Sequence, residues 1–198
     1  EFSTDALAFK LFNGFEMQPT NVLLRMGKAG ETSYGRGEVR ANTLELSDFA
    51  TLMEFLPLER GIKQRFAEYA PHGHIENLLA RWDSADEQDL HYELKARFNQ
   101  LALHRVGNLP GFTGLTGEID GDEEGGTLSI NARNLKLDAP QFLPEVLAFD
   151  SVTAHSSWES YRNRLEVKLG NVSVVNDDLA GSAFGSYQTV ENSPGKID

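Results

Sequence analysis

The chain has 198 residues, of which 40% are hydrophobic and 24% are charged, and its net charge is -12. This length and usage indicate a globular chain with a buried core, either one large all-β domain or two small ones. The acidic balance argues against binding to nucleic acid or to anionic membrane surfaces, which both require a basic footprint. The absence of cysteine excludes disulfides, thiolate metal sites and cysteine nucleophiles.

No apolar run approaches the roughly 18 residues of a transmembrane helix, and no signal peptide opens the chain. The first residue is Glu1 rather than methionine, and strand-like alternation begins almost at once, at Leu7 and Phe9. We therefore expect the chain to be a segment of a longer protein.

Alternation with a period of two residues dominates the sequence. It is clearest between Leu90 and Phe98, where apolar and charged residues alternate and predict a strand with one buried and one wet face. Similar runs at residues 115–119, 127–137, 147–154, 165–174 and 183–190 are separated by Gly, Asn, Asp and Pro clusters, as antiparallel hairpins require. The expected fold class is mainly β, a β-rich α+β domain over residues 1–198 with a curved antiparallel sheet.

Residues 47–70 break this alternation and predict a helical insertion. Ser47 or Asp48 can cap a helix whose apolar residues recur about every 3.6 residues. Pro57 interrupts the helix and Pro71 ends its second half. We expect one broken amphipathic helix packed on the sheet, because a helix lying on a membrane would need Lys and Arg flanks.

A pattern of two apolar pairs recurs along the chain. One residue separates the members of each pair, but two residues separate the pairs, so the alternation changes phase between them. The copies are Val39/Ala41 with Leu44/Leu46, Ala96/Phe98 with Leu101/Leu103, Ile130/Ala132 with Leu135/Leu137, Val167/Leu169 with Val172/Val174, and a weaker fifth, Leu147/Phe149 with Val152/Ala154. Asn stands at or next to the change in four of them. A β-bulge supplies the extra residue, so the pattern predicts kinked strands; chance is the alternative, since alternating sequence produces this spacing readily.

Candidate metal ligands form two groups. The acidic residues 120–126 resemble the start of a calcium loop, but Asn131 stands where the bidentate Glu belongs, so a hairpin turn is favoured. His72 and His74 could share a metal with Glu76, yet such pairs are more often polar residues at a strand start. We expect no metal site and no cofactor.

Candidate catalytic groups are equally weak. Asp177-Asp178, or Asp83 with Asp86, could serve as general acid and base, but acidic clusters in so acidic a chain are usually solvated. Residues 181–185 place Ser182 second rather than central, which excludes a nucleophile elbow. Glycines at 111, 114 and 117 lack phosphate-loop spacing. We therefore expect a non-enzymatic protein.

The stretch Leu-Pro-Gly-Phe-Thr-Gly-Leu-Thr-Gly at residues 109–117, followed by the acidic turn and residues 135–140, resembles the AsmA-like superfamily and, within it, the YhdP branch. Residues 71–78, Trp158 and residues 175–178 support the resemblance. It covers residues 36–190, whereas residues 1–35 match only in general character.

This resemblance implies a protein of the Gram-negative envelope, anchored in the inner membrane and extending through the periplasm. Such a protein is similar to bridge-like lipid transfer proteins, whose curved β-sheet forms an apolar groove for phospholipid moving toward the outer membrane. The implied partners are phospholipid acyl chains and neighbouring β-segments of the same longer chain, with no nucleic acid. A structural or carbohydrate-binding β-module is the alternative, and Trp82, Tyr92 and Trp158 are its plausible sugar-stacking set.

The two apolar pairs of each kinked strand are expected on opposite faces. If the sheet turns at the kink, the first pair packs under the helix and the second lines the open groove. The expected lipid-groove residues are Leu101, Leu103, Leu135, Leu137, Val172 and Val174. Phe98, Ala132 and Leu169 are expected in a closed core.

Overall fold

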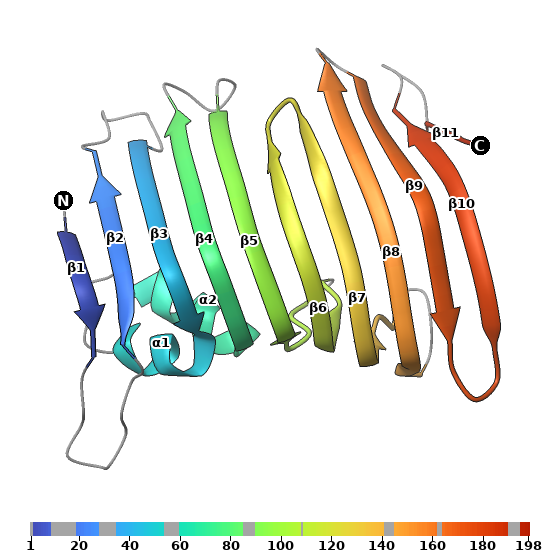
Figure 1. Ribbon diagram of the computed structural model, residues 1–198, viewed down its shortest axis with the longest axis horizontal. Helices are drawn as coiled ribbons and strands as arrows, with labels where there is room; N and C mark the ends of the chain where they lie inside the picture. Colours follow the sequence, from blue (N-terminus) through green and yellow to red (C-terminus); the bar gives the residue numbers. More distant parts are fainter. Residues whose placement is uncertain are drawn as a thin grey trace.

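The computed structural model describes residues 2–8, 19–27, 35–53, 60–84, 90–107, 109–140, 145–161, 164–189 and 195–198. Within these ranges, eleven strands form one antiparallel sheet in which each strand pairs with its neighbours in chain order (Figure 1). The strands are β1 Phe2–Leu7, β2 Thr20–Met26, β3 Gly35–Glu45, β4 His72–Ser84, β5 Leu90–Leu103, β6 Gly111–Asp122, β7 Gly125–Asp138, β8 Leu147–Tyr161, β9 Arg164–Val175, β10 Ala180–Gln188 and β11 Lys196–Ile197. The predicted mainly β, antiparallel fold is confirmed.

Two helices connect β3 to β4 at the lower end of the sheet in Figure 1: α1 Leu46–Met53 and α2 Arg60–Tyr69. The helix begins at Leu46, slightly before the predicted caps, and the predicted break at Pro57 lies outside the described residues. Phe49 of α1 packs against a buried sheet cluster and meets Phe66 of α2 edge-on, with ring centroids 5.8 Å apart. Neither of these helices is long and apolar enough to cross a membrane.

The predicted kinks are present in the middle of the strands. Gln100 in β5 and Asn134 in β7 have φ angles of 52° and 56°, the left-handed region that Asn tolerates better than most residues. In β9 an extra residue at Gly170 shifts the register against both neighbouring strands. Asn42 in β3 lies opposite Asn77 in β4, so both strands change phase together and their register continues unbroken.

Asn42 also explains why Asn suits such a position. Its carboxamide oxygen accepts hydrogen bonds from the backbone N–H of Asn21 (2.6 Å) and from Oγ1 of Thr20 (2.9 Å) on β2. The side chain therefore partners polar groups of the next strand where the regular ladder is interrupted. Thr20, which is fully buried, is fixed by this contact.

The kinks have a consequence opposite to the predicted one. Because the irregularity of the strand falls where the sequence changes phase, both apolar pairs of a strand stay on the same face. Ala41 and Leu44 belong to one buried cluster, and Ala132 and Leu135 belong to another. The expectation that the two pairs lie on opposite faces is therefore wrong.

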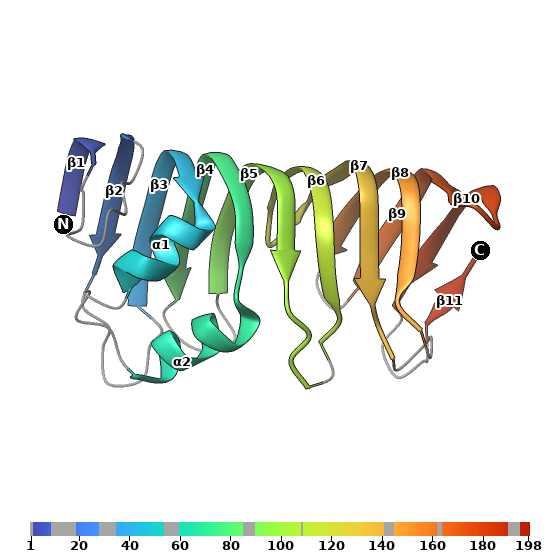
Figure 2. The same cartoon turned by 90° about the horizontal axis from the view of Figure 1, so that it is seen from below.

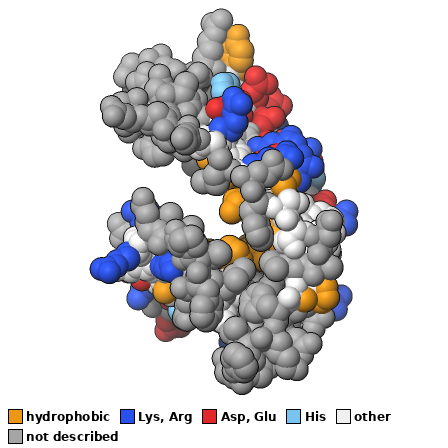
Figure 3. Space-filling model, turned by 90° about the vertical axis from the view of Figure 1, so that its left-hand side faces the viewer, with side chains coloured by type: hydrophobic (Ala, Val, Ile, Leu, Met, Phe, Trp, Pro, Cys, Tyr) orange, Lys and Arg blue, Asp and Glu red, His pale blue; other side chains and the backbone are white. Residues whose placement is uncertain are grey.

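The sheet is strongly curved along its strands, which arch over a hollow (Figure 2). Viewed along the sheet, the molecule has a C-shaped outline, with hydrophobic side chains in the hollow and charged side chains outside (Figure 3). We call these the concave face and the outer face.

Candidate functional site

The concave face is one continuous apolar surface. It contains both buried clusters, the first around Ala41 and Leu44 and the second around Ala132 and Val152. Leu101 packs on the first cluster and Leu115 on the second, and these two residues are direct cross-strand partners. The clusters therefore belong to the same side of the sheet.

Most of this face has no covering layer in the described part of the chain. Helix α1 packs against β3 and β4, whereas the second cluster is built from sheet residues alone. The buried apolar residues among those described are Ala41, Leu44, Leu46, Phe98, Ala132, Leu135, Ala139 and Val152. The other aliphatic residues of the face remain partly open to solvent. A sheet normally buries such a face against a second layer, and in the described residues α1 supplies that layer over β3 and β4.

The six predicted groove residues all lie on the concave face, but not at one depth. Leu103, Leu137 and Val172 are half-buried. Leu101 and Val174 are half-buried and pack on the first and second cluster, respectively. Leu135 is only 8% exposed and is part of the floor of the second cluster.

The three predicted core residues divide differently. Phe98 (9% exposed) and Ala132 (0%) are buried as expected. Leu169 is 44% exposed, so its assignment to a closed core is wrong. Its cross-strand partners are Ser156 and Gly185, which are too small to cover a leucine, and the helices lie far along the sheet over β3 and β4.

Four Trp and Tyr residues lie on one rim of the concave face, in β4, β5, β8 and β10 close to the strand ends that point upward in Figure 1. Trp82 pairs with Tyr92, and Val167 pairs with both Trp158 and Tyr187. Because Trp82 also pairs with Gly37, and Gly37 lies in regular alternation with Ala41, the row faces the hollow. The sequence named three of these residues as candidates but could not place them together.

Each indole of this rim lies on a glycine of an adjacent strand. A β-carbon at Gly37 would come within 2.1 Å of Cζ2 of Trp82, and one at Gly126 within 2.5 Å of Cζ2 of Trp158. Phe98 lies over Gly117 in the same way, with Cζ 3.0 Å from the corresponding position. The glycines provide room for flat rings against the sheet, which fixes the ring positions.

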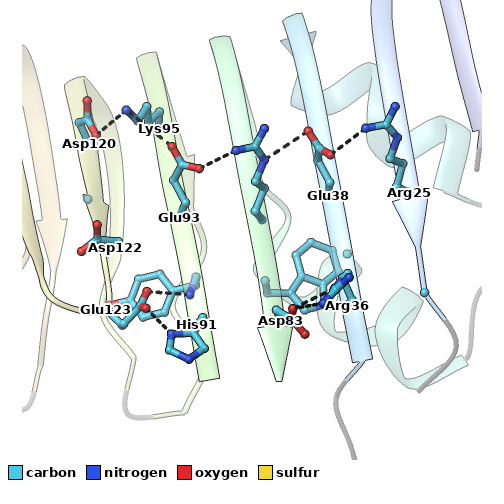
Figure 4. A pocket seen from close by; sticks show the side chains of 16 residues that line it. Arg25, Arg36, Glu38, Asp83, His91, Glu93, Lys95, Asp120, Asp122 and Glu123 are labelled. Carbon is cyan, nitrogen blue, oxygen red and sulfur yellow. Dashed lines mark hydrogen bonds and ion pairs between the residues drawn. The ribbon is translucent and has the colours of Figure 1, made fainter. Parts of the chain in front are cut away.

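The outer face carries a ladder of ion pairs across β2 to β6 (Figure 4). Arg25 lies 3.3 Å from Glu38, Arg81 bridges Glu38 (3.3 Å) and Glu93 (3.0 Å), and Lys95 bridges Glu93 (3.6 Å) and Asp120 (3.4 Å). The alternation predicted charge on this side, but which charges pair depends on register. The face is thus solvated and polar along the same strands whose other side is apolar.

Glu38 is the centre of this ladder, with its side chain only 13% exposed. The hydrogen bond from Arg40, helped by Arg81, lowers the pKa of the Glu38 carboxyl. A second tier joins Arg36 to Asp83 (2.5 Å) and His91 to Glu123 (2.5 Å), and the His91 hydrogen bond lowers the pKa of Glu123. Isolated surface pairs contribute little stability, so the ladder matters mainly as a solvated surface.

The acidic residues considered as metal ligands or as catalytic acids and bases lie in turns of the sheet. Asp122 closes the predicted β6–β7 hairpin by accepting the N–H groups of Glu124 (2.9 Å) and Gly125 (3.0 Å). The turn at Asp177-Asp178 is held by Asn176, whose side-chain oxygen accepts the N–H groups of Asp178 (3.1 Å) and Leu179 (2.7 Å). Both acidic stretches are therefore hairpin turns.

The remaining candidates are also engaged in local contacts. Asp83 is paired with Arg36, and its proposed partner Asp86 lies outside the described residues. His72 stacks on His104 at 6.4 Å, while His74 Nε2 lies 2.9 Å from Oγ1 of Thr43. Over the ranges that the structure describes, no group of three or more His, Cys, Asp or Glu residues could hold a metal ion.

Comparison with known proteins gives one result. A family model described as YhdP protein matches residues 1–198. No curated protein and no solved structure matches the chain.

Proposed function

The chain belongs to the YhdP family, and we propose that its concave face holds the acyl chains of phospholipids that move between the inner and outer membranes. Membership of this family supports a role in the bacterial envelope. We place the chain in the periplasm, as a segment of a protein anchored in the inner membrane of a Gram-negative bacterium. YhdP is not a known enzyme family, and the proposed role needs no catalytic residue.

The observation that supports the proposal is an apolar concave face over most of which the described residues place no second protein layer. Hydrocarbon chains would cover the half-buried residues of this face, such as Leu137 and Val172. Each methylene group transferred from water contributes about 0.8 kcal/mol. The charged outer face suits a water-filled compartment, because its ion-paired side chains stay hydrated while lipid is enclosed on the other side.

Neighbouring β-segments of the same longer chain are proposed to continue the sheet. In the described residues, β11 pairs with Tyr187 and Gln188 of β10, and Asp198 exchanges backbone hydrogen bonds with Ser186, so no described strand lies beside the edge of β10 near Phe184. Phe184 is 87% exposed. An exposed strand edge is a template for pairing with a further strand.

Mass spectrometry of an organic extract from the purified protein tests the lipid proposal directly. We expect phospholipid to copurify with the chain and to be lost in Leu169→Asp and Val172→Asp, which place a carboxylate in the hollow. Asn171→Asp, on the same strand but on the outer face, is the matched control and should retain lipid. Absence of phospholipid from the original chain, or equal retention in all three variants, would refute the proposal.

A second candidate is carbohydrate binding at the aromatic rim. Trp82, Tyr92 and Trp158 all lie on the concave face, as a sugar-stacking surface requires. The two candidates differ in where binding energy arises. A sugar ligand would depend on the rim alone, whereas lipid also needs the aliphatic floor. A soluble oligosaccharide that binds the original chain and the Leu169→Asp variant equally would favour the second candidate.

A further inference from the structure

From β4 to β10, the Trp and Tyr residues of the described strands gather at one end of the strands, whereas the Phe residues lie in the middle or toward the other end. Of the six Tyr and Trp residues in the described ranges, Tyr69 lies on α2 at the lower end of the sheet. The other five lie near the upper ends of the strands: Trp82, Tyr92, Trp158, Tyr161 and Tyr187. Phe112 and Phe149, which have no polar atom, lie near the lower ends of β6 and β8, and Phe49 and Phe66 lie on the helices there.

From β5 to β8, the lower part of the concave face is apolar. Its cross-strand row runs from Leu103 through Phe112 and Leu137 to Leu147, all half-buried. At the opposite rim, Trp82, Tyr92, Trp158 and Tyr187 combine an apolar ring with an N–H or O–H group. Such side chains prefer a boundary where one end is apolar and the other is wet.

From this sorting we infer that a phospholipid lies in the hollow with a fixed polarity. Its headgroup and ester carbonyls lie at the Trp/Tyr rim, and its acyl chains point along the strands toward the Leu103–Leu147 row. This inference rests on the proposed lipid-binding function and specifies how the ligand is oriented. Trp82 and Trp158 act as positioning residues, held by the glycines beneath their rings.

The dimensions of the face allow this arrangement. Trp158 and Leu147 lie on the same strand, and at about 3.3 Å per residue the backbone between them runs for roughly 36 Å. One leaflet of a bilayer has a hydrocarbon thickness of about 15 Å, half of the usual core. An acyl chain that starts at the rim therefore ends within the apolar face, even after allowance for the curvature of β8.

The chain contains only two tryptophans, and both belong to the rim. Their fluorescence therefore reports lipid depth without added labels. The probes are phosphatidylcholines brominated on the acyl chain either next to the carbonyl or next to the terminal methyl group, since bromine quenches tryptophan at short range. We expect the carbonyl-proximal probe to quench the original chain more strongly. Trp82→Phe and Trp158→Phe, which each leave one indole, should show the same order.

The matched control moves the reporter to the other end of the same face. Phe112→Trp, combined with Trp82→Phe and Trp158→Phe, should reverse the order, so that the methyl-proximal probe quenches more strongly. Circular dichroism verifies that the control is folded; if it is not, the two single-Trp variants decide the result alone. Bound lipid is measured in parallel as phosphate carried by the protein after removal of free vesicles.

The outcomes separate the inference from the proposed function. Bound phosphate with stronger quenching by the methyl-proximal probe, or with equal quenching by both probes, would overturn the fixed polarity but leave lipid binding intact. Absence of both bound phosphate and quenching would overturn the proposed function itself. A change in emission with a soluble oligosaccharide, but not with either lipid, would assign the rim to carbohydrate and overturn the inference as well.

Discussion

Two leucines on the concave face, Leu135 and Leu169, are expected to respond very differently to truncation. Leu135 is 8% exposed and packs with Ala132 and Val152, whereas Leu169 is 44% exposed between Ser156 and Gly185. Replacing a buried leucine by alanine removes its transfer free energy and leaves a cavity, which together cost about 2–5 kcal/mol. We expect about 3 kcal/mol for Leu135→Ala, because the open side of the concave face lets neighbouring side chains relax partly into the cavity.

For Leu169→Ala the expected loss is about 1 kcal/mol. Roughly half of the side chain is already in water, so only about half of a transfer term of about 2 kcal/mol is lost, and an open surface leaves no cavity. Urea unfolding followed by the fluorescence of Trp82 and Trp158 measures both changes as shifts in midpoint at constant m value. Equal losses, or a larger loss for Leu169→Ala, would contradict the assignment of depth on this face.

Aspartate substitutions at the same two positions should differ even more in their effect on folding. Leu135→Asp buries an unpaired charge in the second cluster and should prevent folding, because such burial costs several kcal/mol. Leu169→Asp should remain folded, with a circular dichroism spectrum like that of the original chain. A folded Leu135→Asp protein would mean that the floor of the hollow is open to water.

Three further predictions follow from the outer face, the glycines and the acidic turn. Because the pKa of Glu38 is lowered in the folded protein, the carboxylate stabilises the fold above the ordinary glutamate pKa, and this stabilisation is lost as the pH falls through the folded-state pKa. The urea midpoints of the original chain and of Glu38→Gln should therefore differ most near neutral pH and converge in acid. A difference that does not depend on pH would contradict this. Gly117→Ala should lower the melting temperature, because its β-carbon would lie 2.1 Å from the backbone oxygen of Ser129, whereas Gly181→Ala meets nothing within 4 Å and should have little effect. Calcium should not raise the melting temperature, since Asp122 is already used by the hairpin and the turn lacks a bidentate Glu, and a large calcium-dependent rise would show that residues 120–126 bind the ion.

The sequence by itself determined the class and order of the fold. Strict alternation in β5, with charges on every second residue, was enough to predict a strand with an apolar and a polar face. Turn residues between the runs indicated antiparallel neighbours, and all strand pairs do follow chain order. The repeated change of phase near Asn or Gly located the bulges, because a single extra residue is visible in a local pattern.

Only the tertiary structure decided which side each apolar pair faces and how deeply it lies. A phase change in sequence is compatible with side chains on opposite faces or with a bulge that restores one face, and pairing with the neighbouring strand selects between them. Leu135 and Leu169 occupy similar sequence patterns but differ in burial because Leu135 packs beside Val152 and Leu169 beside Gly185. The Trp/Tyr rim and the Arg–Glu ladder arise in the same way, since both join residues of different strands that only the register brings together.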